Sequence, residues 1–366
     1  MSFATGMFLF DAHLDLAMNA MEWNRDLRQP LATIKERESH WTDKPDRGRG
    51  VLSFSEMRSG QIGLCVATQI ARYVKPGSKL PGWHSPEQAW AQTQAQLAWY
   101  RAMEEQGHLV QISNSQQLDA HLTLWNGYQD QHQKLEDLPI GYILSLEGAD
   151  SIVNLSYLEQ SYEQGLRALS LGHYGPGTYA PGTGAEGGLS AAGKELLKEM
   201  DRLGMILDLT HLSDQAFWEA LNLFEGHVWA SHCNCRSLVP NQRQLSDEQI
   251  QAIIQRSGVI GMVFDAWMMY PGWERGVTTP TSAGLYLEHI LDHVDHICQL
   301  AGNASHVGIG SDLDGGYGTE QCPSDINTIA QLQKLNGLLS SRRYSNEDVL
   351  GIFHGNFLNI IRRAWS

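Results

Sequence analysis

The stretch MFLFDAHLDL, residues 7–16, changes character halfway along its length. Its first four residues are large and apolar, as in a buried strand, and Asp11, His13 and Asp15 then follow at every second position. Side chains two residues apart in a strand share a face, so we expect His13 and Asp15 to point the same way at the strand's carboxyl end. An imidazole and a carboxylate so placed suit a divalent cation, although a His–Asp hydrogen bond or a helix N-cap are simpler alternatives for an isolated pair.

Seven further short apolar runs end, like this one, in a titratable or small polar residue. Segments with helical periodicity lie between most of them. Alternating strands and helices with short connections predict a parallel sheet, and eight units in 366 residues favour a closed (β/α)8 barrel of the TIM type over a doubly wound sheet. No Gly-x-Gly-x-x-Gly follows any run, which disfavours a dinucleotide-binding fold. The eight runs are residues 8–15, 62–69, 141–148, 167–173, 205–211, 227–232, 259–265 and 306–312.

Five intervening segments have clear helical signals. Residues 190–204 are the cleanest, with leucines and a methionine on one face and Gly204 at the end. Two other segments open with a Ser-Asp pair that is typical of a helix N-cap. A further apolar segment, HLVQIS at 108–113, indicates a short additional strand. We expect helices over residues 190–204, 213–224, 246–258, 283–302 and 345–365.

The whole chain, residues 1–366, is expected to form one barrel domain with two long rim loops. Residues 20–60 are polar and rich in Arg, Trp and Gly, and residues 174–188 are rich in Gly and Pro. Both segments follow the carboxyl end of a strand, which is the face of such a barrel that carries the active site. We interpret them as mobile loops bordering a pocket, the alternative being ordinary surface loops.

Composition excludes several classes of partner. The formal net charge of −15 argues against binding to nucleic acid or to an anionic membrane surface, both of which need clustered Lys and Arg. Five scattered cysteines without a Cys-x-x-Cys pair indicate free thiols rather than a disulfide framework or a zinc knuckle. No apolar run approaches the ~20 residues of a spanning helix, and the N-terminus has no signal-peptide pattern. We therefore expect a cytoplasmic protein.

The polar residues that end six of the runs would converge at one rim of a barrel. Each has a simple local explanation by itself, but six independent explanations are hard to sustain, because burying so much polarity without metal or mutual pairing is costly. Histidine and carboxylate ligands suit zinc or another first-row divalent ion. A glutamate between two such groups could bridge two ions, and two ions ~3.5–4 Å apart sharing a hydroxide are a common hydrolytic device. The residues are His13, Asp15, Glu147, His173, His211, His232 and Asp312.

Six segments, taken in order, carry a family resemblance: FDAHLD (10–15), LSLEG (144–148), LRALSLGH (166–173), GLSAAGKELLKEMDRLGMILDLTHLS (188–213), WASHCNCRSLVPNQRQLSDEQI (229–250) and HVGIGSDLDGG (306–316). Together they resemble the membrane (renal) dipeptidase family, the M19 zinc peptidases, and in particular its soluble bacterial members. The resemblance runs from about residue 8 to GNFLNIIRRA (355–364), which is nearly the whole chain. The fourth and sixth segments are specific, whereas His-x-Asp alone is not.

The resemblance implies a (β/α)8 barrel with a binuclear zinc site that cleaves dipeptides. By position in the motifs, His13 and Asp15 would hold one Zn²⁺. His211 and His232 would hold the other, and Glu147 would bridge the two ions.

The resemblance also implies three further roles. Asp312 matches the family's acid/base carboxylate, and His173 matches the histidine that polarises the scissile carbonyl. Arg243 falls at the arginine that binds the free carboxylate of the dipeptide, a contact that suits a planar guanidinium. The alternative for Arg243 is a surface arginine at a helix start.

The chain departs from the family pattern at three places. Leu14 stands where Asn is usual between the first two ligands, and Cys233 follows His232 where many members have Ser. The thiols of Cys233 and Cys235 lie near the predicted metals but should face away from them. The stretch after the first strand, residues 18–30, is absent from the commonest members, and loops near the rim determine which substrate side chains are preferred.

We conclude from the sequence that the protein is a cytoplasmic zinc dipeptidase in which a metal-bridging hydroxide attacks the peptide carbonyl. Its partner would be a small dipeptide, with a D-residue at the C-terminal position as one option, and a homodimer is the family's habit. The alternative on the same binuclear barrel is another amide or ester hydrolase, such as an N-acyl-amino-acid hydrolase or a lactonase. A third hypothesis, a non-catalytic barrel with structural metals, would leave Asp312 without a physical role.

Overall fold

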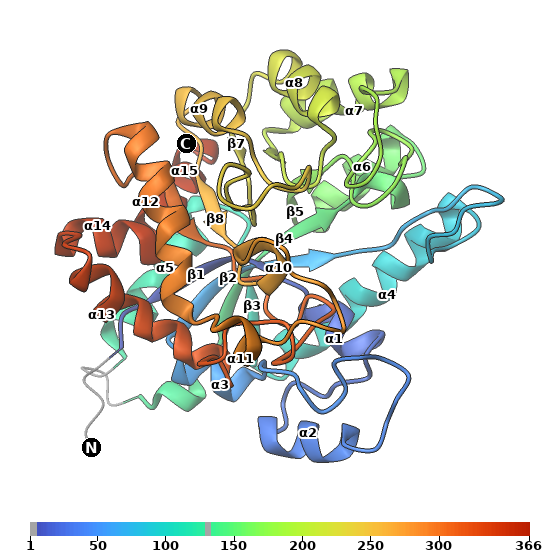
Figure 1. Cartoon of the computed structure of the whole chain (residues 1–366). Helices are drawn as coiled ribbons and strands as arrows, with labels where there is room; N and C mark the ends of the chain where they lie inside the picture. The colour runs from blue at the N-terminus through green and yellow to red at the C-terminus, as the bar shows by residue number, and fades with distance from the viewer. Residues whose placement is uncertain (1–5, 129–132) are drawn as a thin grey trace.

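The computed structural model describes residues 6–128 and 133–366, and these form a parallel barrel surrounded by helices (Figure 1). The strands are hydrogen-bonded in the order β7-β6-β5-β4-β2-β1-β9-β8, and every pairing is parallel. An isolated bridge between Ala230 and Ile260 joins the two ends of this order, so the sheet closes on itself. The eight strands are β1 (Leu9–Leu14), β2 (Ile62–Gln69), β4 (Ile140–Glu147), β5 (Leu166–Ser170), β6 (Ile206–Asp208), β7 (Val228–Trp229), β8 (Ile260–Met262) and β9 (Val307–Ile309).

The eight predicted runs and the barrel are confirmed, but five strands end earlier than predicted. Each of β5 to β9 stops three residues before the end of its run. At two of these positions the backbone has already turned away from the sheet, because His211 and Asp312 have φ values of 70° and 55°. The polar residues that end these runs therefore lie on short turns beyond the strands, at the active face of the barrel.

The additional strand predicted within 108–113 is also present. It is β3 (Leu109–Gln111), which pairs in parallel with the first residues of β4. β5 pairs further along β4, from Leu144 to Glu147, while β2 pairs with β4 over residues 64–69. β3 is consequently a short appendage at the start of β4 and takes no part in closing the barrel.

Three of the predicted helices are found nearly as expected. They are α7 (Ala191–Leu203), α8 (Asp214–Leu223) and α9 (Asp247–Gln255), each with a serine N-cap that accepts a backbone N–H. Gly204 ends α7 in the left-handed conformation with φ 66°. The remaining helices are α1 (Leu16–Met21), α2 (Leu31–Glu38), α3 (Phe54–Ser59), α4 (Pro86–Glu105), α5 (Ser115–Gly127), α6 (Leu155–Glu163), α10 (Ala266–Met269), α11 (Pro280–Ala283), α12 (Ile290–Ala301), α13 (Lys334–Ser341), α14 (Asn346–Leu350) and α15 (Asn356–Ala364). Five short turns of 3₁₀ or π type complete the elements: η1 (Leu135–Asp137), η2 (Ala149–Ser151), η3 (Leu287–His289), η4 (Ile329–Gln333) and η5 (Gly351–Gly355).

Two predicted helices are interrupted. The segment 283–302 is not one helix, because Gly284 ends α11 with φ 62° and α12 begins only after the turn η3. The segment 345–365 contains a π-helical turn, η5, between α14 and α15. Within the described part of the chain, no helix is both long and apolar enough to cross a membrane.

The segment 20–60, expected as a loop, contains α2 and α3 and a buried group of charges. Arg25 donates to Glu38 and Asp46 at 2.9 Å each and lies 3.7 Å from Asp314, while Arg47 donates to Glu38 at 2.8 Å. We call these five residues the arginine cluster. It ties the segment to the turn that follows β9, because the carboxylate of Asp314 also accepts the backbone N–H groups of residues 51 and 52.

Candidate metal and substrate site

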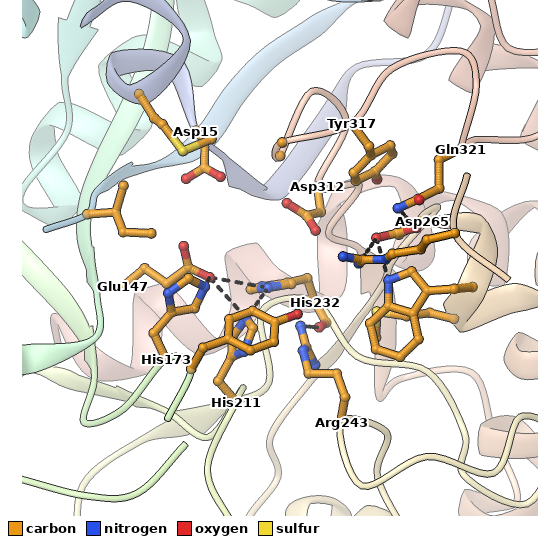
Figure 2. A pocket seen from close by; sticks show the side chains of 18 of the residues that line it. Asp15, Glu147, His173, His211, His232, Arg243, Asp265, Asp312, Tyr317 and Gln321 are labelled. Carbon is orange, nitrogen blue, oxygen red and sulfur yellow. Dashed lines mark hydrogen bonds and ion pairs between the residues drawn. The ribbon is translucent and has the colours of Figure 1, made fainter. Parts of the chain in front are cut away.

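All seven polar residues that end the predicted runs meet at the carboxyl ends of the strands. Figure 2 shows the six of them that line the pocket: Asp15, Glu147, His173, His211, His232 and Asp312. Glu147 is at the centre, at the end of β4. Its Oε1 atom lies 3.1 Å from Nε2 of His211, 3.5 Å from that of His232, and 3.7 Å from those of His13 and His173. One carboxylate oxygen thus faces four imidazoles that come from four different strand ends.

Two further carboxylates, those of Asp15 and Asp312, lie beside His13. Nε2 of His13 is 3.8 Å from Oδ1 of Asp15 and 3.7 Å from Oδ1 of Asp312. The hydroxyl of Thr68 on β2 donates to Oδ1 of Asp15, which holds that side chain in place. The prediction that His13 and Asp15 point the same way is consistent with this geometry.

His211 and His232 face each other through Nε2 atoms 3.2 Å apart. Their outer nitrogens are held by hydroxyl groups: Nδ1 of His211 is 2.9 Å from Oγ1 of Thr183, and Nδ1 of His232 is 2.8 Å from Oγ of Ser231. A hydroxyl oxygen can accept a hydrogen bond from Nδ1–H, and the Nε2 lone pairs are then available to a cation.

Burial and mutual charge shift the pKa values of this cluster strongly. Burial raises the pKa of Glu147 to about 7 and holds that of Asp312 well above its usual range. Burial alone would lower the pKa of His13, but Glu147, Asp15 and Asp312 outweigh it and raise that pKa to about 10. Burial, with Arg243 nearby, holds the pKa of His211 well below its usual range. Such opposed shifts are typical of functional sites.

The residues fit divalent metal ions. Nε2 of His13 is buried and has no hydrogen-bond partner among the described residues, which is costly unless a cation binds there. Nitrogen and carboxylate donors suit zinc and related ions. Three overlapping groups have all their ligand atoms within 4.8 Å of one another: His13, Glu147 and His232; Glu147, His173 and His211; and His13, Asp15 and Asp312. We call the residues of these three groups the ligand cluster.

Arg243 is buried rather than at the surface, with 4% of its area exposed, and its guanidinium lines the pocket in front of the ligand cluster. Its Nη2 donates to the backbone oxygen of His232 at 2.9 Å, and its Nη1 to Sγ of Cys233 at 3.1 Å. The Cys233 thiol is thus engaged with Arg243, and Cys235 packs against the backbone of His293. Among the described residues, neither cysteine belongs to a group that could hold a metal.

The pocket has a volume of about 270 Å³. Sequence analysis missed several of its walls. Asp265 ends the seventh predicted run but was not included among the candidate site residues. Trp23 lies in the segment 20–60, which was expected to border a pocket, although no residue of it was named. Asp265 accepts from Trp267 at 2.6 Å and from Gln321 at 2.8 Å, and burial raises its pKa to about 6. The missed lining residues are Met18, Trp23, Ile70, Tyr174, Asp265, Trp267, Met268, Arg275, Gly315, Gly316, Tyr317 and Gln321.

Comparison with known sequences gives a consistent result. The chain matches the family model of membrane dipeptidases, peptidase family M19, over residues 2–365. An uncharacterized protein from the pqqA 5′ region of Klebsiella pneumoniae is 28% identical over 268 residues, which are 70% of this chain and 95% of that protein. Dipeptidase tcpJ of Claviceps purpurea is 28% identical over 235 residues, 61% of this chain; the chain spans only 52% of that relative's length.

Two solved structures share the fold. Dipeptidase AC, a metallopeptidase of family M19, has a TM-score of 0.77 at 23% identity, with 99% of both chains covered. A metallopeptidase from Rhodobacter sphaeroides, liganded with a phosphinate mimic of the dipeptide L-Ala-D-Ala, has a TM-score of 0.74 at 22% identity, covering 99% of this chain and 100% of the other.

A parallel barrel with imidazoles and carboxylates gathered at the carboxyl ends of its strands defines a metal-dependent hydrolase. The family match extends over nearly the whole chain. The chain belongs to the membrane dipeptidase family, peptidase family M19. It is therefore an enzyme of the metallo-dipeptidase class, a hydrolase that acts on dipeptides.

Proposed function

We propose that the protein hydrolyses dipeptides with two zinc ions held by five residues of the ligand cluster. His13 and Asp15 would hold one ion, His211 and His232 the other, and Glu147 would contact both. The observation that carries this assignment is the position of Glu147, whose Oε1 lies within 3.1–3.7 Å of Nε2 in both His13 and the His211–His232 pair. When bound, such ions acidify water and polarise a carbonyl group, the chemistry that amide hydrolysis needs at neutral pH.

The protein's own residues would manage the proton and the developing charge. A water molecule adds to the peptide carbonyl carbon and the C–N bond breaks. Asp312, whose pKa burial holds well above its usual range, takes a proton from the water and gives it to the leaving amine. His173, with its Nε2 at the edge of the pocket, donates a hydrogen bond to the carbonyl oxygen as negative charge develops there.

Arg243 supports a substrate with a free carboxylate. A buried guanidinium in a small pocket offers bidentate recognition of a carboxylate and has little use in a lactonase. A pocket of about 270 Å³ also suits small substrates. The Rhodobacter relative, liganded with a mimic of L-Ala-D-Ala, supports the inclusion of a D-residue at the C-terminal position.

The test is turnover of L-Xaa-L-Xaa and L-Xaa-D-Xaa dipeptides by zinc-loaded protein, with N-acetyl-alanine and a lactone alongside. We expect dipeptide cleavage, none by the His211→Ala variant, and about two ions per chain by metal analysis. Cleavage of N-acetyl-alanine or the lactone but of no dipeptide would assign the site to another class of hydrolase.

Arg243→Ala sharpens the choice of substrate. Because hydrogen bonds to a charged group contribute about 1.5–3 kcal/mol, we expect kcat/KM for dipeptides to fall on the order of 10- to 100-fold, while the amide of the same dipeptide is affected far less. Equal losses on the carboxylate and the amide substrates would contradict the assigned contact.

A further inference from the structure

Arg72 lies three residues beyond β2, in the segment that extends away from the barrel between β2 and α4 (Figure 1). Its guanidinium turns back toward the site: Nη2 is 2.8 Å from Nδ1 of His173, and Nη1 donates to the backbone oxygen of Pro81 at 3.0 Å. Sequence analysis gave Arg72 no role. It does not line the pocket in front of the ligand cluster, yet it touches a residue that does.

The contact fixes which nitrogen of His173 carries the proton. A guanidinium has only donors and stays protonated, so Nδ1 of His173 must accept this hydrogen bond with its lone pair. A doubly protonated imidazole could not do so, and neither could the tautomer with hydrogen on Nδ1. The remaining form is the neutral imidazole with its proton on Nε2, the nitrogen that faces Glu147 from 3.7 Å.

The hydrogen-bond partners of Nδ1 therefore distinguish the roles of three histidines that surround the carboxylate of Glu147. His211 and His232 have hydroxyl groups at Nδ1; these can accept a hydrogen bond from Nδ1–H, which leaves Nε2 free to bind a cation. His173 has a cation at Nδ1, so its Nε2 carries hydrogen and offers no lone pair. This difference removes His173 from the metal ligands, although its position alone would include it.

We propose that Arg72 is a positioning residue that holds His173 as an Nε2–H donor and keeps it from binding metal. The catalytic part of this inference rests on the proposed function, because the donor would face the scissile carbonyl oxygen. The tautomer and the exclusion from the metal follow from the contact itself. They hold whatever the substrate.

The direct test is ¹⁵N NMR of histidine-labelled protein, recorded with and without zinc, with His173 assigned from the spectrum of His173→Gln. We expect a protonated Nε2 and an unprotonated Nδ1 in both states of the wild type, because Arg72 occupies Nδ1 with or without zinc. Zinc is diamagnetic, so the signals remain observable when it is bound. In Arg72→Met, which has no donor, we expect a mixture of tautomers, and in Arg72→Lys a return toward the wild-type form. A proton on Nδ1 in the wild type, or an unchanged tautomer in Arg72→Met, would overturn the proposal.

The kinetic test separates positioning from a merely structural role. Arg72 also helps to hold its segment through Pro81, so a loss of activity alone would not decide. We expect Arg72→Met to lower kcat about 10- to 100-fold with little change in KM, as for other residues that orient a catalytic group. In the His173→Gln background the same substitution should have no further effect on kcat. An additional loss of kcat in that background would show that Arg72 supports the structure of its segment and does not act through His173.

The two arms also distinguish this proposal from the proposed function. If wild-type protein cleaves no dipeptide, the proposed function is wrong, but the NMR experiment still tests the tautomer of His173 independently. If Arg72→Met does not fold, the wild-type spectrum and Arg72→Lys carry the test.

Discussion

The same end of the barrel contains two buried polar clusters of opposite character. The arginine cluster combines two guanidinium groups with three carboxylates, and its ion pairs are between 2.8 and 3.7 Å long. The ligand cluster combines imidazoles with carboxylates. At its centre, the Oε1 atom of Glu147 and the Nε2 atoms of His211 and His232, all of which can accept hydrogen bonds or bind a cation, face one another. In the arginine cluster, each carboxylate lies within 3.7 Å of a guanidinium of the same chain, whereas the ligand cluster has no Arg or Lys among its members and needs cations from outside. Buried polarity therefore indicates a ligand site only where the chain does not supply the opposite charge.

The largest effect expected from this comparison is on catalysis. His211→Ala removes a side chain that faces Glu147 at 3.1 Å, and should cost at least ~10³-fold in kcat/KM together with one bound zinc ion. The folded state of metal-free protein should be little affected, because the substitution also removes a buried polar group. Activity within tenfold of wild type would show that His211 is no ligand.

Arg25→Met should affect stability and leave the metals in place. Removing one partner of a buried ion pair typically costs about 3–5 kcal/mol, because the carboxylates left behind remain buried. Denaturant unfolding measures this loss, and metal analysis of the folded fraction should still find the wild-type zinc content. Arg28→Met is the matched control in the same segment: its partner Asp26 forms an exposed pair, so less than about 1 kcal/mol should be lost. Equal losses in the two variants would contradict the comparison.

Zinc itself should stabilise the fold through the ligand cluster. An ion that binds only the folded state adds about 2.7 kcal/mol at a free concentration 100 times its Kd. Thermal unfolding with zinc and with a chelator measures this difference. It should persist in Arg25→Met, because the Arg25 side chain contacts none of the residues that would hold zinc, and shrink strongly in Glu147→Gln. A zinc effect that is lost in Arg25→Met but retained in Glu147→Gln would reverse the assignment of the two clusters.

The last effect appears only at low pH and comes from His293, a buried histidine outside both clusters. Burial lowers its pKa to about 4, and its Nδ1 accepts the backbone N–H of Cys235 at 3.1 Å. Above pH 6.5 this residue is neutral in both the folded and unfolded chain. As the pH falls from 6.5 to 4 the unfolded chain binds a proton that the folded one does not, so stability should decrease by up to about 3 kcal/mol. The free energy of unfolding of His293→Gln, measured over the same pH range, should decrease less than that of the wild type. Identical pH profiles for the two proteins would contradict the assigned role of His293.

Much of the fold and the ligand cluster could be predicted because both depend on local patterns. A parallel barrel places every strand end on one rim, so residues that end apolar runs meet there whatever their distance in sequence. The turns beyond the strands were less predictable. His211 and Asp312 have positive φ values, and nothing in the runs themselves indicated that β6 and β9 stop three residues earlier.

The missing parts of the site depend on contacts between distant segments. Arg72 and Trp23 come from connections whose sequences have no periodicity, and each acquires its surroundings only from the folded chain. Asp265 was different, since it ends a predicted run as the other site residues do. The apolar run before it gave the same signal, and the rule that residues ending such runs meet at one rim would have included it.

The arginine cluster also limits how this enzyme could be redesigned. Trp23, in the pocket wall, donates to Asp46, which also accepts from Arg25. Asn19, in turn, receives a hydrogen bond from Arg25 and donates to the backbone oxygens of Asp15 and Asp314. The segment 20–60 therefore cannot be exchanged between relatives as an independent unit to change the substrate preference. Replacing it would also loosen the backbone that carries Asp15, so new specificity is better sought by single substitutions at Trp23.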